Sequence, residues 1–472
     1  MINYYVSRYL NIIPLTDTYL LFNGFNGCID EISKSLGEYL SKNKAVSISQ
    51  YISQKEIEFL LKRGHLTKLT DEQELAEFKK YVNILDEHAL ERYSMQGSLM
   101  LLLSYDCNLN CYYCYQKPIR NKKSNKLMTK EFIDNLYDNY IPKLYPNISK
   151  ADIDISLYGG EPLLRRNREV IERILKYAAE YSNHVGAISN CTEVEYFSDI
   201  IGPLPGMINF IQVSIDGDRE THNNSRISYD GAPTFSLILK NIHMMLDKKV
   251  NLNIRINIEA NSIEKLSYLY DILRKEEILD HPYAYVYVHP LHNHFKQTDG
   301  HNFITHEQAA NIIEKMDPQG IIRHPIKREA DSLAYLMSIE KGVALSKTRF
   351  CMQCIPNNYV IDPYGDLYGC YEEVGRDELK IGSLVNGDVI FTPLKEQYLK
   401  RSLLNLNKCL GCSVALVCAG ECGVQARENN KDIFNPYCNY RKDEILEAIK
   451  YVYKKNQSEV YSNSFNLLFP NL

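Results

Sequence analysis

The sequence predicts an α/β protein: a partial (β/α)6 TIM-like barrel with an N-terminal winged-helix-like module and a C-terminal cysteine-rich domain. Three observations support this prediction. From about Leu99 onward, short apolar runs rich in β-branched residues alternate with segments of helical periodicity. The first 95 residues do not show this alternation, and eight of the 13 cysteines fall between positions 351 and 438.

The barrel prediction rests on six rounds of strand and helix. Repeated βα units require a parallel sheet, and about 190 residues hold six units rather than the eight of a closed barrel. We therefore expect an open barrel whose functional residues lie in the loops that follow the strands. Thr129 and Ser262 are expected to cap two of the intervening helices. The predicted strands are 98–105, 152–158, 184–189, 208–215, 251–259 and 283–291.

Residues 1–95 predict a winged-helix-like module. An Asn-Gly turn indicates a hairpin within 18–29, and Ile57 and Leu60 lie on one face of a helix that Gly64 ends. The charged helix 71–93 is expected to bridge to the barrel with a solvated face. The predicted domains are 1–95, a barrel at 96–300, a helical linker at 301–348, a cysteine-rich domain at 349–445, and a C-terminal helix and tail at 446–472.

Composition excludes several function classes. Among 472 residues, 54 Lys and Arg oppose 59 Asp and Glu, and no basic block marks a nucleic-acid partner. No apolar run approaches the ~20 residues that a membrane span needs, and no signal peptide is recognisable, so we expect a cytoplasmic protein without a membrane partner. An odd number of cysteines in such a protein favours metal or redox chemistry over disulfides.

The first cysteine cluster follows the first barrel strand. Cys107, Cys111 and Cys114 form a Cys-x3-Cys-x2-Cys loop. Three soft thiolates suit a cubane iron-sulfur cluster and leave its fourth iron open to a small molecule. Structural zinc is the alternative, but it normally takes four ligands and no fourth lies nearby in the sequence.

This loop resembles the signature of the radical S-adenosylmethionine (radical SAM) superfamily. The resemblance implies that the open iron binds SAM, and that reductive cleavage of SAM gives a 5′-deoxyadenosyl radical that abstracts hydrogen from a substrate. It also implies contacts between SAM and residues that follow the strands. Cys191 departs from the family, which often has glycine there. The implied SAM-binding residues are Tyr113, Gly159, Gly160, Glu161, Pro162, Ser189, Asn190, Ser214, Asp216 and Arg226.

The second cysteine region resembles the SPASM extension of radical SAM enzymes. That resemblance implies two auxiliary [4Fe-4S] clusters, three clusters in all, and an exit for an electron from the substrate radical. Two zinc sites are the alternative for this region alone. The implied ligand sets are Cys351, Cys354, Cys370 and Cys422 for the first cluster, and Cys409, Cys412, Cys418 and Cys438 for the second.

Three residues after Cys370 are candidate acid/base groups: Tyr371, Glu372 and Glu373. Sulfatase-maturing relatives have an acidic base at the position of Tyr371, so this departure weakens a sulfatase role.

By resemblance, the function expected is a peptide maturase that forms a thioether or carbon-carbon cross-link on a ribosomally made precursor. Its N-terminal module would bind the leader segment of the precursor as an added strand. A flavodoxin- or ferredoxin-type protein would supply electrons. Two alternatives stay open: formylglycine formation on a sulfatase, and a non-enzymatic redox sensor that binds DNA through the winged helix. The near-neutral charge opposes the sensor.

Overall fold

The structure is a computed structural model that describes residues 4–123, 126–260, 262–291, 303–317, 320–338, 347–438 and 441–459. Parts of the predicted linker 301–348 and the tail beyond residue 459 lie outside these ranges. The chain divides into two compact units. Unit 1 contains 1–90, 326–354 and 400–472, and unit 2 contains 91–325 and 355–399.

Unit 2 is built on the six parallel strands that the sequence predicts. Strands that are neighbours in the sheet are also consecutive in the chain, so the sheet has the order β12-β11-β10-β9-β8-β7. The prediction of a mixed α/β fold with a large parallel sheet is confirmed. The strands are β7 (Gly97–Leu102), β8 (Ile153–Tyr158), β9 (Val185–Ser189), β10 (Ile208–Ser214), β11 (Asn251–Ile258) and β12 (Ala284–Pro290).

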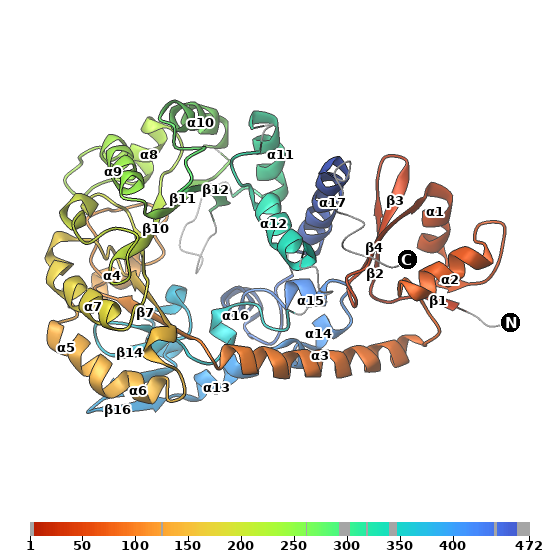
Figure 1. The fold of residues 1–472 in the computed structure, drawn as a ribbon, viewed down its shortest axis with the longest axis horizontal. Coiled ribbons are helices and arrows are strands. Elements are labelled where there is room, and N and C mark those ends of the chain that lie inside the picture. Colours follow the sequence, from red (N-terminus) through yellow and green to blue (C-terminus); the bar gives the residue numbers. More distant parts are fainter. Residues whose placement is uncertain are drawn as a thin grey trace. The chain divides into compact units, whose positions relative to one another are not determined.

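Amphipathic helices cover the outer face of this sheet (Figure 1). Helices α7 (Arg168–Glu180), α9 (Phe235–Asp247) and α10 (Leu266–Lys275) each bury a stripe of apolar residues spaced three and four apart. Because the outer face is filled in this way, the carboxyl ends of the strands and the loops after them carry the polar side chains.

Further helices follow the strands of unit 2. They are α4 (Lys117–Lys123), α5 (Lys130–Asn135), α6 (Ile141–Leu144), α8 (Arg219–Ser225) and α11 (His306–Met316). Thr129 caps α5 by accepting a hydrogen bond from the amide of Phe132, as predicted. Ser262 does not cap a helix with its side chain; its hydroxyl accepts from the amide of Glu259 instead, which closes a turn after β11.

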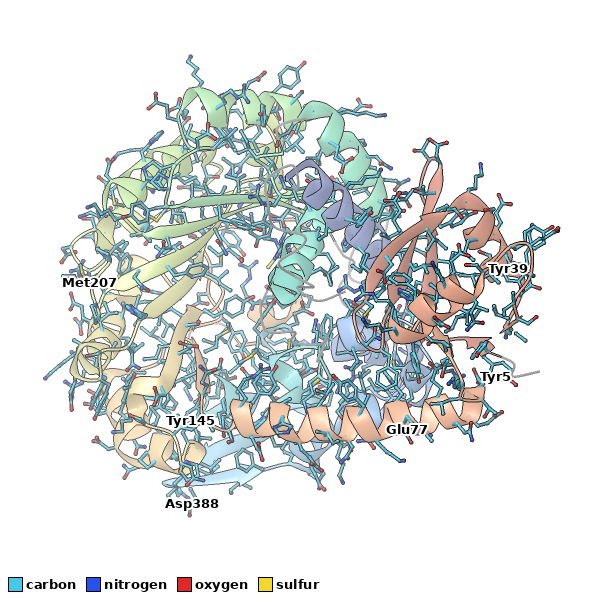
Figure 2. All side chains as sticks on the ribbon, turned by 45° about the vertical axis from the view of Figure 1, so that its right-hand side comes forward. Tyr5, Tyr39, Glu77, Tyr145, Met207 and Asp388 are labelled. Atoms are coloured by element: carbon cyan, nitrogen blue, oxygen red, sulfur yellow. The ribbon has the colours of Figure 1, made fainter. Side chains whose placement is uncertain are left out.

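The sheet does not end at β7. Strand β13 (Asn358–Ile361) pairs in parallel with β7, and the antiparallel strands β14 (Asp366–Tyr368), β15 (Gly382–Val385) and β16 (Asp388–Phe391) follow it. Part of the cysteine-rich region thus joins the barrel sheet, because the edge of β7 offers unpaired backbone groups that another strand can satisfy. At the far edge, Lys143 of α6 pairs with Asp388 at 2.7 Å. Figure 2 labels Asp388 at this edge.

Unit 1 begins with two small sheets and two helices. Strands β1 (Tyr4–Val6), β5 (Ala45–Val46) and β6 (Leu66–Thr67) form one sheet, and β2 (Leu10–Pro14), β3 (Thr18–Asn23) and β4 (Ile29–Ser33) form the other. The predicted hairpin is the β3–β4 pair. Helices α1 (Lys34–Lys42) and α2 (Gln54–Lys62) pack Leu36, Leu40, Ile57 and Leu60 into a common core.

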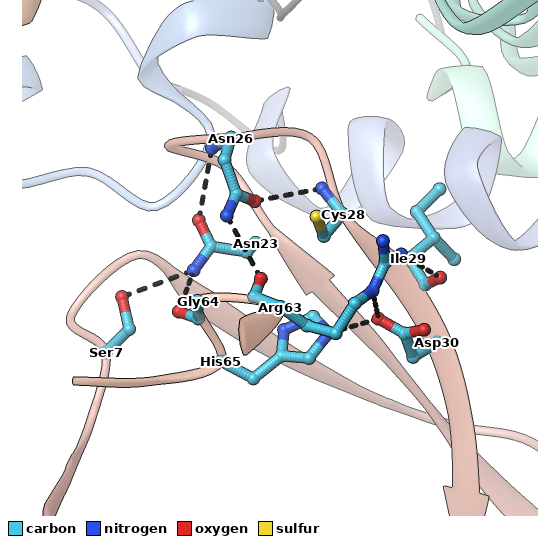
Figure 3. A network of polar contacts seen from close by, with 9 residues as sticks. All are labelled: Ser7, Asn23, Asn26, Cys28, Ile29, Asp30, Arg63, Gly64 and His65. Atoms are coloured by element: carbon cyan, nitrogen blue, oxygen red, sulfur yellow. Dashed lines mark hydrogen bonds and ion pairs between the residues drawn. The ribbon is translucent and has the colours of Figure 1, made fainter. Parts of the chain in front are cut away.

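A network of ion pairs and hydrogen bonds joins the strands of this module to the turn after α2 (Figure 3). Asp30 of β4 accepts from Arg63 Nε at 2.7 Å and lies 2.6 Å from His65 Nε2. Both partners lie just after α2, so the network ties the strand to the turn that follows the helix. Asn23 extends the network by donating to the carbonyl of Gly64 at 2.5 Å. The sheet and helices of the module therefore hold a fixed relation to each other.

Helix α3 (Asp71–Tyr93) has the predicted bounds, but the expectation of a solvated face is only partly right. Glu74, Phe78, Val82 and Asp86 form a buried stripe spaced four apart. Phe78 stacks on Tyr9 with ring centroids 4.2 Å apart, and Glu74 accepts from the hydroxyl of Ser7 at 2.6 Å. Carboxylates in this stripe are buried because each has a partner from elsewhere in unit 1.

Asp86 provides a test of this packing. Its carboxylate receives two hydrogen bonds from Arg349, at 2.9 and 2.8 Å, and both side chains are almost fully buried. Replacing Asp86 by alanine leaves a buried guanidinium without its counter-charge, so we expect the free energy of unfolding to fall by about 3 kcal/mol in urea denaturation. The matched control is Glu87→Ala on the exposed face of α3, which should change stability by less than about 0.5 kcal/mol. Equal effects of the two variants would contradict a buried ion pair.

The cysteine-rich part of unit 1 is mostly short helices: α14 (Asn407–Leu410), α15 (Ala415–Cys418) and α16 (Gly423–Asn430), followed by the longer α17 (Arg441–Glu459). Helices α12 (Pro325–Ser338) and α13 (Pro393–Lys400) lie near the points where the chain passes between the units. Over the described residues, no helix is long and apolar enough to cross a membrane.

Candidate radical and cluster sites

The loop after β7 carries Cys107, Cys111 and Cys114 and is held in place by backbone pairing. The amide of Asn110 donates to the carbonyl of Ile227 at 2.7 Å, and the amide of Tyr229 donates to the carbonyl of Asn108 at 3.2 Å. The loop is therefore fastened to the segment that follows Arg226. Both segments lie at the carboxyl end of the parallel sheet, where the sequence places the site.

The three thiols are at least partly buried, with Cys111 8% exposed. Burial raises the pKa of Cys107 to about 12 and raises that of Cys111, while Arg226 and Arg120 act to lower the latter. Among the described residues, no three metal-binding side chains converge as ligands of a single ion. A cubane cluster does not need three side chains that converge on one ion, because each thiolate binds a separate iron.

Gly159 and Gly160 follow β8 and lie against the start of the cysteine loop. The amide of Gly160 donates to the carbonyl of Ser104 at 3.0 Å, and the amide of Glu161 donates to the carbonyl of Asp106 at 2.8 Å. A Cβ on Gly159, whose φ is +152°, would lie 2.5 Å from the oxygen of Ser104. These glycines let two loops approach closely, a role that sequence reasoning assigned only to contact with SAM.

Glu161 joins the ends of two neighbouring strands. Its carboxylate accepts from the hydroxyl of Ser189 and the amide of Asn190, both at 2.6 Å, and from the amide of Leu163 at 2.9 Å. Burial raises the pKa of Glu161 to about 7, and these hydrogen bonds act in the opposite direction. Pro162 takes part through its carbonyl, which accepts from Asn167 at 2.8 Å.

The loop after β9 approaches the first cysteine. Asn190 donates to Asn108 at 2.8 Å, and its Nδ2 lies 3.8 Å from the sulfur of Cys107. Cys191 is fully buried and has a φ of +58°. That left-handed conformation explains physically why glycine would suit the position. Asn241, which sequence reasoning missed, holds the strained residue by donating to the carbonyl of Cys191 at 2.7 Å.

Tyr113, Asp216 and Arg226 form one buried polar cluster. The Tyr113 hydroxyl donates to the Asp216 carboxylate and accepts from Arg226 Nη1 at 2.8 Å. Asn257, the fourth member, donates to Asp216 at 3.0 Å. No sequence signal singled out Asn257, because β11 (NLNIRINI) alternates polar and apolar residues along its length and also contains Asn251 and Asn253. Ser214 ends β10 beside Arg255 in the strand register, and no hydrogen bond joins its side chain to the cluster among the contacts described.

Arg226 retains hydrogen-bonding capacity. Its side chain is buried, and its Nε has no hydrogen-bond partner among the described residues. A buried, unpaired nitrogen on a guanidinium is costly, and a carboxylate would satisfy it. The residues present thus fit the carboxylate end of an amino acid such as the methionine moiety of SAM.

The three acid/base candidates, Tyr371, Glu372 and Glu373, lie in different surroundings. Tyr371 packs edge-on against Tyr158 at the end of β8, with ring centroids 5.3 Å apart. Burial raises the pKa of Glu372 to about 7, and Arg255 of β11 lowers it. Glu373 is fully buried and accepts from the hydroxyl of Tyr398 at 2.6 Å, which gives it a structural partner.

Four cysteines of unit 1 lie near one another: Cys409, Cys412, Cys418 and Cys438. The pKa of Cys409 is raised to about 12, first by burial and then by the negative charges of Cys418, Cys438 and Cys412. The N-terminal module contacts this loop directly, because Tyr9 donates to the carbonyl of Leu410 at 2.8 Å and Asn11 donates to that of Ser413 at 3.1 Å. Four neighbouring thiols fit the ligand set of a four-cysteine cluster.

The other implied set is divided between the units. Cys351, Cys354 and Cys422 belong to unit 1, and Cys370 belongs to unit 2. Within unit 1, the pKa of Cys354 is lowered to about 6, first by a hydrogen bond with Cys351 and then by Arg401. Arg401 is completely enclosed and donates to the carbonyls of Gly420 and Ile433, both at 2.7 Å. A guanidinium at this point compensates thiolate charge in the interior.

The chain is similar to several known proteins. The family described as "4Fe-4S single cluster domain" matches residues 96–232. The chain is 24% identical over 396 residues to the cysteine-type anaerobic sulfatase-maturating enzyme of Clostridium novyi (strain NT), which covers 77% of this chain and 96% of the relative. It is 25% identical over 192 residues to the radical SAM cyclopropyl synthase TigE of Paramaledivibacter caminithermalis, covering 36% of this chain and 40% of TigE.

A solved structure has the same fold. Native anSMEcpe with bound AdoMet superimposes with a TM-score of 0.58 at 19% identity, covering 76% of this chain and 99% of that one. The two chains therefore share the overall fold.

Proposed function

Because the chain is a radical SAM enzyme related to the SPASM-type maturases, we propose that it modifies a ribosomally made precursor peptide by forming a thioether or carbon-carbon cross-link. The observation that carries the first half of this proposal is the convergence of the cysteine loop, Glu161 and the cluster of Tyr113, Asp216, Asn257 and Arg226 at one end of the sheet. When bound, the [4Fe-4S] cluster and SAM supply a 5′-deoxyadenosyl radical.

The residues of the chain have separate tasks in this proposal. Cys107, Cys111 and Cys114 would hold three irons, and Arg226 would bind the carboxylate of SAM. Glu161 would orient the loops after β8 and β9, and its remaining acceptor capacity would receive the ammonium group. Tyr113 would be fixed by Asp216 and Arg226 beside the bound cofactor. Glu372, a partly buried carboxyl whose pKa is raised to about 7 by burial while Arg255 acts to lower it, is our candidate for the group that takes a proton from the substrate.

A cross-link requires the loss of two hydrogens, and the second electron must leave the substrate radical. The four thiols Cys409, Cys412, Cys418 and Cys438, together with the set Cys351, Cys354, Cys370 and Cys422, are proposed to hold two auxiliary clusters for this purpose. The enclosed Arg401 supports the proposal, because a buried cation beside Cys354 offsets the negative charge that thiolate ligands bring. A flavodoxin- or ferredoxin-type protein remains our proposed electron donor.

The N-terminal module is proposed to bind the leader of the precursor. Its sheet β2-β3-β4 is short, and β4 is an edge strand among the described residues, which is the arrangement that strand addition uses. The network of Asp30, Arg63 and His65 would keep this edge rigid (Figure 3). Contact of the module with the Cys409–Cys412 loop would link the leader site to the proposed second auxiliary cluster.

The test is coexpression with candidate precursor peptides, beginning with any small open reading frame beside the gene, followed by mass spectrometry. A cross-link appears as a peptide lighter by two hydrogens, with stoichiometric 5′-deoxyadenosine. Cys412→Ala, which removes one proposed auxiliary ligand, should keep SAM cleavage and lower the cross-linked product about ten-fold. Loss of SAM cleavage in that variant, or an unchanged yield of product, would contradict the role given to the auxiliary site.

Formylglycine formation is the second candidate. The likeness to the sulfatase-maturating enzyme of Clostridium novyi over most of both chains favours it, while Tyr371 at the position of the acidic base opposes it. A sulfatase peptide containing Cys or Ser separates the two candidates. Its conversion to the aldehyde, with no change in the precursor peptide, would replace the cross-linking proposal.

A further inference from the structure

Arg120 is a buried cation beside the first cysteine cluster that no role assigned so far accounts for. It lies on α4, only six residues after Cys114, and its side chain is 5% exposed. Its Nη1 donates to the carbonyl of Leu109, inside the cysteine loop, at 3.0 Å. This single hydrogen bond fixes the guanidinium next to the loop.

The other nitrogens of Arg120 are unsatisfied. Neither Nε nor Nη2 has a hydrogen-bond partner among the described residues, although both are buried. Desolvation on its own would lower the pKa of Arg120, yet the pKa is raised, with Cys114 and Cys107 as the largest raising causes. A buried guanidinium that is held against the cysteine loop through Leu109 and has two open donors is suited to sulfur acceptors carrying negative charge.

We propose that Arg120 donates hydrogen bonds from Nε and Nη2 to sulfur atoms of the [4Fe-4S] cluster held by Cys107, Cys111 and Cys114, and thereby raises its reduction potential. Accepting one electron makes the cluster more negative, so a nearby cation and its N–H donors stabilise the reduced form more than the oxidised form. Arg120 is a positioning and tuning residue in this role. The proposal rests on the cluster assignment and is independent of the peptide substrate.

The test is a redox titration of reconstituted full-length protein without SAM or peptide. The cluster is followed by the EPR signal that the Cys107/Cys111/Cys114→Ala variant lacks. At the potential that reduces half of the wild-type cluster, Arg120→Met should show a reduced fraction about ten-fold lower. Arg120→Lys, which keeps the charge but loses the planar fork, should lie between the two. Lys122→Met removes the same charge from an exposed position on α4 and should match the wild type.

Iron content and SAM affinity distinguish other roles for Arg120. An unchanged reduced fraction at full iron content would overturn the proposal. Loss of the EPR signal and of about four irons in both variants of Arg120, with the fold intact, would mean that Arg120 only shapes the loop through Leu109. Weaker SAM binding with an unchanged potential would assign it to the SAM carboxylate instead. If the signal is missing from the wild-type protein as well, the cluster assignment itself fails.

Discussion

Alanine at Cys107, Cys111 and Cys114 is expected to abolish formation of 5′-deoxyadenosine, with at least a ~1,000-fold loss relative to the wild-type protein. The loop that carries these thiols is held by backbone pairing with residues 227–229, so the replacements remove ligands without removing the supports of the loop. Without three thiolates, no iron is positioned to bind SAM. The measurement is chromatographic quantification of 5′-deoxyadenosine after addition of SAM and a strong reductant.

Iron analysis sharpens this experiment. Three cubanes predict about twelve irons per chain in the wild-type protein and about eight in the triple variant. The isolated buried cysteine Cys191 gives the matched control, because Cys191→Ala removes a thiol near the site without removing a proposed ligand. Full retention of 5′-deoxyadenosine by the triple variant, or a metal content dominated by zinc, would reject the radical mechanism.

Arg226→Met is expected to weaken SAM binding by roughly 100-fold, because a charge-assisted hydrogen bond to the carboxylate of SAM is lost in a buried site. The guanidinium already donates to Tyr113 at 2.8 Å, and its Nε is the donor left over for a ligand. Arg226→Lys should recover part of the affinity, since the charge remains but the planar pair of donors does not. Equilibrium binding of SAM to the reconstituted protein measures the effect.

The control for Arg226 lies on α8, the helix that ends one residue before it. Arg219 is exposed at the start of α8, and Arg219→Met should leave the affinity for SAM unchanged. Iron content and the EPR signal of the cluster should stay at wild-type values in Arg226→Met. A variant that loses iron together with SAM binding would assign Arg226 to support of Tyr113 and the cysteine loop rather than to the cofactor.

The sequence by itself determined the six strands and the place of the cysteine loop. Periodicity predicted β7 to β12 within a few residues, because short segments rich in β-branched residues alternate with segments of helical spacing. The spacing of Cys107, Cys111 and Cys114, and of Gly159, Gly160 and Glu161 one unit later, is local information. Short-range spacing of this kind is set by the chain itself and can be read without a structure.

Only the tertiary structure decided which distant residues meet. Asn257 and Arg120 carry no local signal for the site, yet Asn257 closes the cluster around Asp216 and Arg120 donates to the carbonyl of Leu109 inside the cysteine loop. The pairing of β13 with β7 and the buried acids of α3 were likewise missed. The physical reason is the same in each case: the cost of burying a polar group or leaving a strand edge open is met by a partner far along the chain, and sequence spacing does not specify that partner.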